Sequence, residues 1–370
     1  MSFTLATFNA LDFFDDGTPD SRAGADPQLP LVADRMPSVS PASRPNARRV
    51  AEYQRKLDAM SAVVQSLDAD VIAWQEVQNA RVLDDLRRRL AARGALPFGG
   101  YLDPVAASAN PRGIACGLLS RLPIRTWTEH APTSLPMPAF VELDAPAFVG
   151  RLRLRRAAIE ATIELPDGTL ATVVVVHFKS ALPTPAQDAA GNDVPIVSQR
   201  DLGEARVRSA VVRMAEALYI RGLVDAQFDR DPNSQIAVAG DFNDVEGSAV
   251  HSIVGGARQF DTPLAAIREA SGAGVSSLRR LAARALRSCA ESVPEPARFT
   301  SVFRGARAMI DHILVSESLA ERLESVRIVN ETLVQQVSNL DRTGASDHAP
   351  VVAHFRCAGA AHPGLNLLTI

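Results

Sequence analysis

The sequence predicts an α/β protein in which two β-sheets pack face to face and helices cover their outer sides. In the first and last thirds of the 370 residues, short apolar runs alternate with the spacing of amphipathic helices. In the middle third, apolar runs follow one another directly, and the turn Pro166, Asp167, Gly168 is typical of a hairpin. The chain is 46% hydrophobic and 22% charged, which provides enough apolar material for a large core.

The predicted strands are short apolar runs that end at a polar or turn-forming residue. They comprise residues 3–8, 69–74, 114–119, 124–127, 151–164, 170–176, 235–241, 300–303, 308–315, 326–329 and 350–355. The predicted helices carry apolar residues on one side, such as Leu57, Met60 and Val64 in the first of them. They comprise residues 48–67, 80–92, 202–221, 246–254 and 276–288.

We expect residues 1–370 to form one domain that carries three loop insertions. Length alone permits two or three domains, but large α/β sandwiches also reach this size. The expected insertions lie at about residues 15–46, 182–197 and 265–296. The first two contain Pro and Gly, and the third contains the Arg-rich helix predicted at residues 276–288.

Bulk composition narrows the functional classes. The net charge of -3 and the pI of about 6.2 provide no global basic field, so nucleic acid would have to bind a local patch. Three distant cysteines form neither a disulfide framework nor a zinc spacing, which favours a reducing compartment. Neither a signal peptide nor an apolar stretch of about 20 residues is visible. We therefore expect a cytoplasmic protein with no membrane span and no obligate protein partner.

Six strand ends carry polar side chains suited to one kind of chemistry. Alternate residues of a strand point to the same side, so Asp241 and Asn243 should project together while Phe242 faces the core. Functional residues gather at one edge of a layered sheet, which predicts one shared cleft. The residues at these ends are Asn9; Glu76; His177 with Lys179; Asp241 with Asn243; Asp311 with His312; and Asp347 with His348.

This set combines carboxylates, amides and imidazoles, and it lacks a cysteine nucleophile. Oxygen ligands favour a hard cation such as Mg²⁺, which binds one or two carboxylates together with a substrate phosphate. Mn²⁺ or Ca²⁺ can take its place. The pattern predicts metal-assisted hydrolysis of a phosphate ester, in which a carboxylate orients water and an imidazole stabilises charge. The sequence contains neither the serine-hydrolase signature G-x-S-x-G nor the phosphate-loop signature G-x-x-x-x-G-K-[ST].

Each of these residues also has an ordinary structural explanation. Asp241 and Asn243 alone could form a strand-end turn, and Glu76 could serve as the N-terminal charge of a helix. His177 could be a core histidine, and Lys179 could be a solvated surface cation. The weight of the functional hypothesis therefore comes from the six strand ends taken together.

His312 and Arg112 are not assigned to the chemistry of this set. His312 directly follows Asp311 in a predicted strand, so the two side chains should point to opposite sides, and we expect a structural role for His312. Arg112 precedes a predicted strand next to Gly113 and could reach a substrate.

Six segments match a known family in their order along the chain. They read TFNALDFF, AWQEVQN, VVHFKS, AGDFND, MIDHILVS and SDHAPV. They resemble the motifs of the endonuclease/exonuclease/phosphatase superfamily, which includes pancreatic-type deoxyribonucleases, exonuclease III-like enzymes, sphingomyelinases and inositol-polyphosphate phosphatases. The longer segments EYQRKLDAM, LDADVIAWQEVQN and RFTSVFRGARAMIDHILVS are similar to a bacterial branch usually described as nucleases. The resemblance runs from Phe3 to Phe355 and implies a four-layer α/β/β/α sandwich with two mixed β-sheets.

The resemblance also implies how the metal and the attacking water are held. Glu76 would be the main Mg²⁺ ligand, and Asp347 and Asn9 would line the metal and phosphate site. Asp241 would orient or deprotonate the attacking water. Asn243 would position that water or a phosphate oxygen.

The remaining residues would contact the scissile phosphate. The resemblance implies that His348, held by Asp311, and His177 stabilise the transition state or serve the leaving group. Lys179 would bind phosphate. One departure is Gln78, which stands where some nucleases carry an Arg that touches DNA.

The expected function is therefore Mg²⁺-dependent hydrolysis of phosphodiester bonds, with DNA or RNA as the first substrate to consider. A phosphatase, or a phosphodiesterase for lipid headgroups or inositol phosphates, is the alternative within the enzymes. A catalytically silent binding module is the alternative from another class. It ranks last because Glu76, Asp241, Asn243 and His348 are all present.

Overall fold

The computed structural model describes residues 1–15, 47–94, 100–139, 141, 148, 152–257, 275–333 and 344–357. Most strands in these ranges form two six-stranded mixed sheets. The first contains, in spatial order, β13 (Leu323–Ile328), β14 (Val351–Arg356), β1 (Ser2–Phe13), β2 (Val71–Val77), β4 (Ala115–Ser120) and β3 (Val105–Ala106). The second contains β5 (Ile124–His130), β6 (Ala158–Glu164), β7 (Leu170–His177), β8 (Gln235–Asp241), β12 (Asp311–Ser316) and β9 (Leu286–Ser288).

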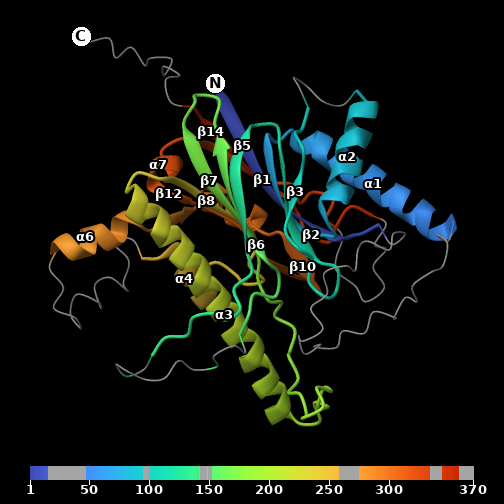
Figure 1. Cartoon of the computed structure of the whole chain (residues 1–370), viewed down its shortest axis with the longest axis vertical. Coiled ribbons are helices and arrows are strands. Elements are labelled where there is room, and N and C mark those ends of the chain that lie inside the picture. Colours follow the sequence, from blue (N-terminus) through green and yellow to red (C-terminus); the bar gives the residue numbers. More distant parts are fainter. Residues whose placement is uncertain are drawn as a thin grey trace.

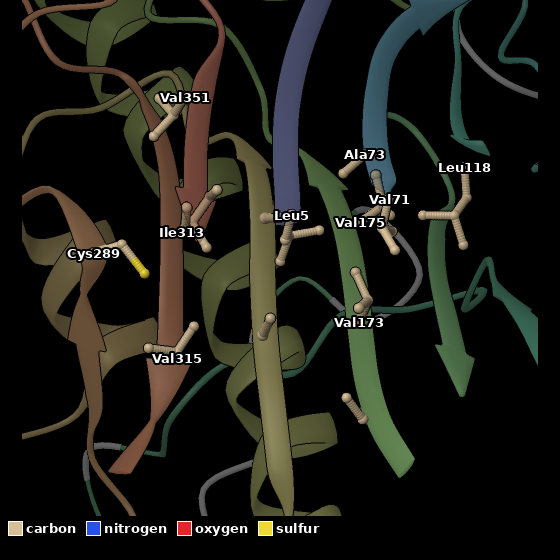
Figure 2. Packing of buried hydrophobic residues seen from close by; sticks show 14 of the residues in the cluster. Leu5, Val71, Ala73, Leu118, Val173, Val175, Cys289, Ile313, Val315 and Val351 are labelled. Carbon is tan, nitrogen blue, oxygen red and sulfur yellow. The ribbon is translucent and has the colours of Figure 1, made fainter. Parts of the chain in front are cut away.

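The two sheets enclose an apolar core, and helices cover their outer sides. Figure 2 shows side chains from both sheets in this core, among them Leu5, Val71, Val175 and Ile313. The helices α1 (Ala47–Leu67) and α2 (Ala80–Ala92) pack on the first sheet. The helices α3 (Gln199–Arg230) and α4 (Ala249–Gly255) pack on the second, and Figure 1 shows the two pairs on opposite sides of the molecule. This arrangement confirms the predicted four-layer α/β/β/α sandwich.

Smaller elements complete the described part of the chain. The strands β10 (Ser301–Phe303) and β11 (Ala306–Ala308) form a separate hairpin. The remaining helices are α6 (Val275–Ala283), α7 (Glu317–Ala320) and the 3-10 turns η2 (Cys289–Ser292) and η3 (Glu295–Ala297). Among the described residues, no helix is both long enough and apolar enough to cross a membrane.

Two of the predicted elements differ from the structure for identifiable reasons. The strand predicted at residues 151–164 begins only at Ala158. The backbone N–H of Arg155 donates to Glu216 of α3 at 2.8 Å, so the chain there bonds to a helix side chain instead of a neighbouring strand. The helix predicted at residues 276–288 ends at Ala283. The residues Leu286–Ser288 instead pair with β12 and form the edge of the second sheet.

The three expected insertions are described to different extents. Except for Asp15, the segment 15–46 lies outside the described residues. Residues 182–197 form a loop with one isolated bridge between Gln187 and Asp193. Of residues 265–296, the described part includes β9, so this segment contributes a strand to the sheet. The division of the chain into one domain with insertions stays a prediction.

Candidate active site

Strand register brings three of the predicted site residues into one row. β7 pairs in parallel with β8 so that His177 lies opposite Asp241, and β12 pairs antiparallel with β8 so that Asp311 also lies opposite Asp241. Residues directly opposite each other in a ladder point to the same face of the sheet. His177 Nε2 lies 3.5 Å from Asp241 Oδ2. All three side chains are buried, and they form a polar row at one end of the second sheet.

Asn9 and Glu76 reach this row from the first sheet. The Asn9 amide donates to Asp241 Oδ2 at 3.0 Å and to Glu76 Oε1 at 3.4 Å. His177 Nε2 lies 4.0 Å from the same Glu76 oxygen. The two sheets therefore contribute adjacent side chains to a single site.

A β-bulge sets the direction of the Glu76 side chain. Glu76 has a φ of 59°, and the pairing of β2 with both β1 and β4 shifts register at this point. Bulges re-aim a side chain, and a left-handed backbone costs a non-glycine residue about 1–3 kcal/mol. The backbone N–H of Asp12 donates to Glu76 Oε2 at 3.1 Å and holds the carboxylate in place. The helix that follows is capped by Asn79, so Glu76 is not its capping residue.

The turn after β8 places Asn243 beside Asp241. Asn243 has a φ of 52°, and its backbone N–H donates to Asp241 Oδ1 at 2.7 Å. Its side-chain amide donates to Asp241 Oδ2 at 3.1 Å and to the carbonyl of Phe178 at 3.0 Å. Phe242 is fully buried, as the strand pattern predicted. The two polar side chains do project together, but a turn and not an extended strand brings them into contact.

His348 joins the row from the segment that precedes β14. Its Nδ1 lies 2.8 Å from Asp311 Oδ2, and because a carboxylate only accepts, Nδ1 carries the proton of this hydrogen bond. Ser346 Oγ donates to the carbonyl of Asn9 at 2.7 Å and accepts from the backbone N–H of His348 at 3.0 Å. Asp347, between these two residues, is 1% exposed. The segment is thereby fastened to the end of β1.

Burial and neighbouring charges separate the protonation states of this site. Burial, followed by the charge of Asp311, raises the pKa of Asp241 to about 7. Burial by itself lowers the pKa of His348, but the nearby carboxylates of Asp311, Asp241 and Asp347 outweigh it and hold that pKa well above its usual range. Burial lowers the pKa of His177 well below its usual range. The site therefore combines an imidazolium with a neutral imidazole, which suits them to different tasks.

Lys179 makes hydrogen bonds within the loop that follows β7. Its ammonium donates to the carbonyl and hydroxyl oxygens of Ser180, both at 3.0 Å, and to the carbonyl of Leu182 at 3.1 Å. An ammonium has three N–H donors, so these bonds use all of them. The backbone N–H of Lys179 donates to Glu216 of α3 at 2.6 Å. In this structure the Lys179 ammonium therefore holds the following loop, and its expected contact with phosphate stays a prediction.

Lys56 of α1 is a buried cation that supports the site but lies outside the six strand ends. Its side chain is almost completely buried, and Nζ donates to the carbonyls of Leu11 and Ala345, both at 2.9 Å. These carbonyls belong to the segments that carry Asn9 and Asp347. One feature of the sequence points to Lys56, because it is one of only two lysines among 39 basic residues.

The residues of this edge fit a hard divalent cation. Asp241 and Asp311 offer carboxylate oxygens that lie, together with a ring nitrogen of His348, within 4.8 Å of one another. Asp311 Oδ1 is buried and accepts no hydrogen bond from the described residues. The Glu76 side chain is 18% exposed and borders the same group. Hard cations bind carboxylate and amide oxygens, which are the donors that predominate here.

Sequence comparison identifies the family. The sequence model of the Endonuclease/Exonuclease/phosphatase family matches residues 7–348, and this chain belongs to that family. Members of the family are phosphoester hydrolases that typically use a divalent metal, so the protein is a metal-dependent phosphoester hydrolase. No curated protein matches the chain.

Solved structures with a similar course of the chain come from several organisms. An endonuclease/exonuclease/phosphatase from Bacteroides vulgatus is 16% identical, with 96% of this chain and 99% of that chain covered and a TM-score of 0.49. A mannosyl-6-phosphatase from Bacteroides thetaiotaomicron is 15% identical, with 95% and 98% covered and a TM-score of 0.49. TDP2 from D. rerio, complexed with single-strand DNA product, is 12% identical, with 96% and 99% covered and a TM-score of 0.47.

The Lys56→Met substitution tests the fastening of the two site segments to α1. It removes a charged donor from two carbonyls, so we expect the free energy of unfolding to fall by about 2 kcal/mol. Arg55→Met is the matched control, because Arg55 is an exposed cation on the same helix and should change stability by less than about 0.5 kcal/mol. Denaturant unfolding measures both variants. Equal stability of the two variants would contradict a fastening role for Lys56.

Proposed function

We propose that this protein is a Mg²⁺-dependent phosphodiesterase that acts on nucleic acid. The observation that carries the proposal is the hydrogen-bonded pair of Asp311 and His348 next to buried Asp241, with Asn9 and Glu76 in contact from the other sheet. Groups that can act as a general acid, as a general base and as oxygen ligands thus lie at one edge of the sandwich. That combination is what in-line attack of water on phosphorus requires.

Glu76, Asp347 and Asn9 are the residues that we assign to the divalent ion. The ion supplies Lewis-acid polarisation of a phosphoryl oxygen when bound. Glu76 is the accessible carboxylate of this group, and the Asn9 amide fixes the Glu76 oxygen relative to Asp241. A phosphate bound to this ion would lie against the row of β7, β8 and β12.

Asp241 and Asn243 are assigned to the attacking water. Asp241 receives hydrogen bonds from the amides of Asn9 and Asn243, which fix the direction of its carboxylate. A carboxylate held in this way can orient a water molecule and take its proton. Asn243 donates to Asp241 and to a backbone carbonyl, so its own position is set by two contacts.

His348 and His177 are assigned to the phosphate. The hydrogen bond from Nδ1 to Asp311 leaves Nε2 of His348 as the donor that can face a phosphoryl oxygen. A charged donor aimed at the developing negative charge stabilises the transition state. His177 lies between Glu76 and Asp241 and is assigned a neutral hydrogen-bonding role.

The His348→Ala substitution tests the hydrolytic assignment. With Mg²⁺ and a phosphodiester reporter, we expect kcat to fall by about 10²–10⁴-fold, because a charged donor to the transition state is lost. Removing divalent ions with EDTA should abolish the wild-type rate. His354→Ala in β14 is the matched control and should retain wild-type activity. Undiminished turnover in His348→Ala would contradict the assignment.

The local charge near the site supports a polyanionic substrate. Arg112 and Arg156 both act electrostatically on His177, and Arg112 is exposed in the loop before β4. An exposed guanidinium that acts on His177 is suited to bind a phosphate group that neighbours the one being cleaved. This supports nucleic acid although the overall charge of the protein is slightly negative.

One observation favours a smaller phosphate ester as the second candidate. Gln78, at the position where some nucleases carry a DNA-contacting Arg, is 7% exposed and accepts from the backbone N–H of Asp15 at 2.7 Å. Its side chain therefore serves the local fold. A phosphatase or headgroup phosphodiesterase needs only a local phosphate pocket and would not require a cation there.

A substrate panel with the Arg112→Ala variant separates these candidates. The panel contains DNA, RNA, inositol phosphates, sphingomyelin and a small phosphodiester reporter, each with Mg²⁺. We expect the highest wild-type kcat/KM on DNA or RNA, and we expect Arg112→Ala to raise KM on the polymer several-fold while KM on the reporter stays unchanged. Selective turnover of a monoester or a lipid headgroup would contradict the nucleic-acid assignment. Mg²⁺-dependent thermal stabilisation without any turnover would instead indicate a binding module.

A further inference from the structure

A second group of potential metal ligands lies on the helix-covered side of β12. His312 follows Asp311 in this strand and is fully buried, so it points away from the catalytic row. Its ring packs against Phe242 with ring centroids 4.9 Å apart. The ring of His251 in α4 lies 5.0 Å from the His312 ring at an interplanar angle of 62°.

The hydrogen bonding of His312 leaves one ring nitrogen available as a ligand. Nε2 lies 2.9 Å from the carbonyl oxygen of Asp244, and because a carbonyl only accepts, Nε2 must carry the proton. Nδ1 then bears a lone pair, and no described residue donates a hydrogen bond to it. Metal-bound histidines are commonly oriented by donating the other ring N–H to a backbone carbonyl, as here.

Glu246 supplies a carboxylate to the same group. One ligand atom from each of Glu246, His251 and His312 lies within 4.8 Å of the other two. Glu246 Oε1 accepts from Ser288 Oγ at 2.9 Å, and Oε2 accepts from Arg298 at 3.3 Å. Each carboxylate oxygen can accept a second partner, so the two contacts orient Glu246 without using up its capacity. The positive charge of Arg298 repels a bound cation. The three ligands must therefore bind the ion strongly enough to outweigh this repulsion.

We propose that Glu246, His251 and His312 bind a transition-metal cation of the Zn²⁺ type, separate from the hydrolytic site. Two imidazoles with one carboxylate suit Zn²⁺, whereas Mg²⁺ prefers oxygen ligands throughout. Ligand atoms around tetrahedral Zn²⁺ stand about 3.4 Å apart, given bonds of about 2.0–2.2 Å. The ligand atoms lie within 4.8 Å of one another, so the group has to contract by at most about 1.4 Å. Glu246 and His251 are only partly buried and can make that adjustment.

The position of this group gives the cation a structural role. Glu246 lies in the loop after β8, His251 lies in α4, and His312 lies in β12. A bound ion would join these three segments behind the row of Asp241 and Asp311. Phe242 directly follows Asp241 in the chain, and its ring packs against the ring of His312. It therefore connects the catalytic row to the proposed metal site. The ion would thus stabilise the back of the candidate active site without touching the substrate.

Co²⁺ binding to the chelator-treated full chain tests the proposal without measuring activity. Excess Mg²⁺ is present to occupy the oxygen-rich edge. We expect the wild type to bind one Co²⁺ with visible d–d absorption bands, which stoichiometric Zn²⁺ removes. His251→Gln and Glu246→Gln should each weaken Co²⁺ binding by at least about tenfold. Both residues are partly exposed, and thermal unfolding without metal verifies that the variants are folded.

Two control variants locate the bound ion. Glu76→Gln, at the hydrolytic edge, and His354→Gln, in β14, should both retain wild-type Co²⁺ binding. Zn²⁺ should raise the unfolding temperature of the wild type and of these controls, but not that of His251→Gln. The proposal is overturned if the wild type binds no Co²⁺, if His251→Gln and Glu246→Gln bind it as well as the wild type does, or if Glu76→Gln abolishes the bands. In those cases the two histidines serve only to pack against Phe242.

Discussion

The register of β7, β8 and β12 is the constraint on which the candidate active site depends. Because β8 pairs with both neighbours, Asp241 has His177 on one side and Asp311 on the other. Gly240 permits this close pairing, since its φ is 155° and an added Cβ would lie 1.9 Å from the carbonyl oxygen of Val176. A shift of one residue would turn each side chain to the opposite face and disperse the row. The pairing of the strands therefore positions these side chains without the help of a cation or a substrate.

The buried carboxylates at this edge of the sandwich need positive charges and hydrogen bonds from other segments of the chain. Several carboxylates lie there with little solvent, and burying them costs free energy unless hydrogen bonds or cations compensate. His348 supplies one positive charge through its bond to Asp311, and Lys56 holds the two neighbouring backbone segments. A divalent cation at Glu76 would complete the compensation. The strained backbone of Glu76 is consistent with a residue whose position serves function more than stability.

The sequence sufficed for the features that depend on local pattern. The strand that ends at Asp241, the helix from Ala80 to Ala92 and the sandwich of two sheets follow from apolar periodicity and turn residues. Features that depend on distant partners could not be predicted in this way. The bulge at Glu76 requires the paired strands, and the contacts of Lys179 and Lys56 depend on carbonyls whose positions only the folded chain defines.

We propose that side chains from both sheets surround one divalent ion at the row of β7, β8 and β12. Anomalous diffraction from crystals soaked in Mn²⁺ tests it most directly, because the ion is located without reference to activity. We expect a strong anomalous peak bound to the Glu76 carboxylate and adjoining Asn9 and Asp347. A Mn²⁺ peak elsewhere on the molecule, with none at Glu76, would contradict it.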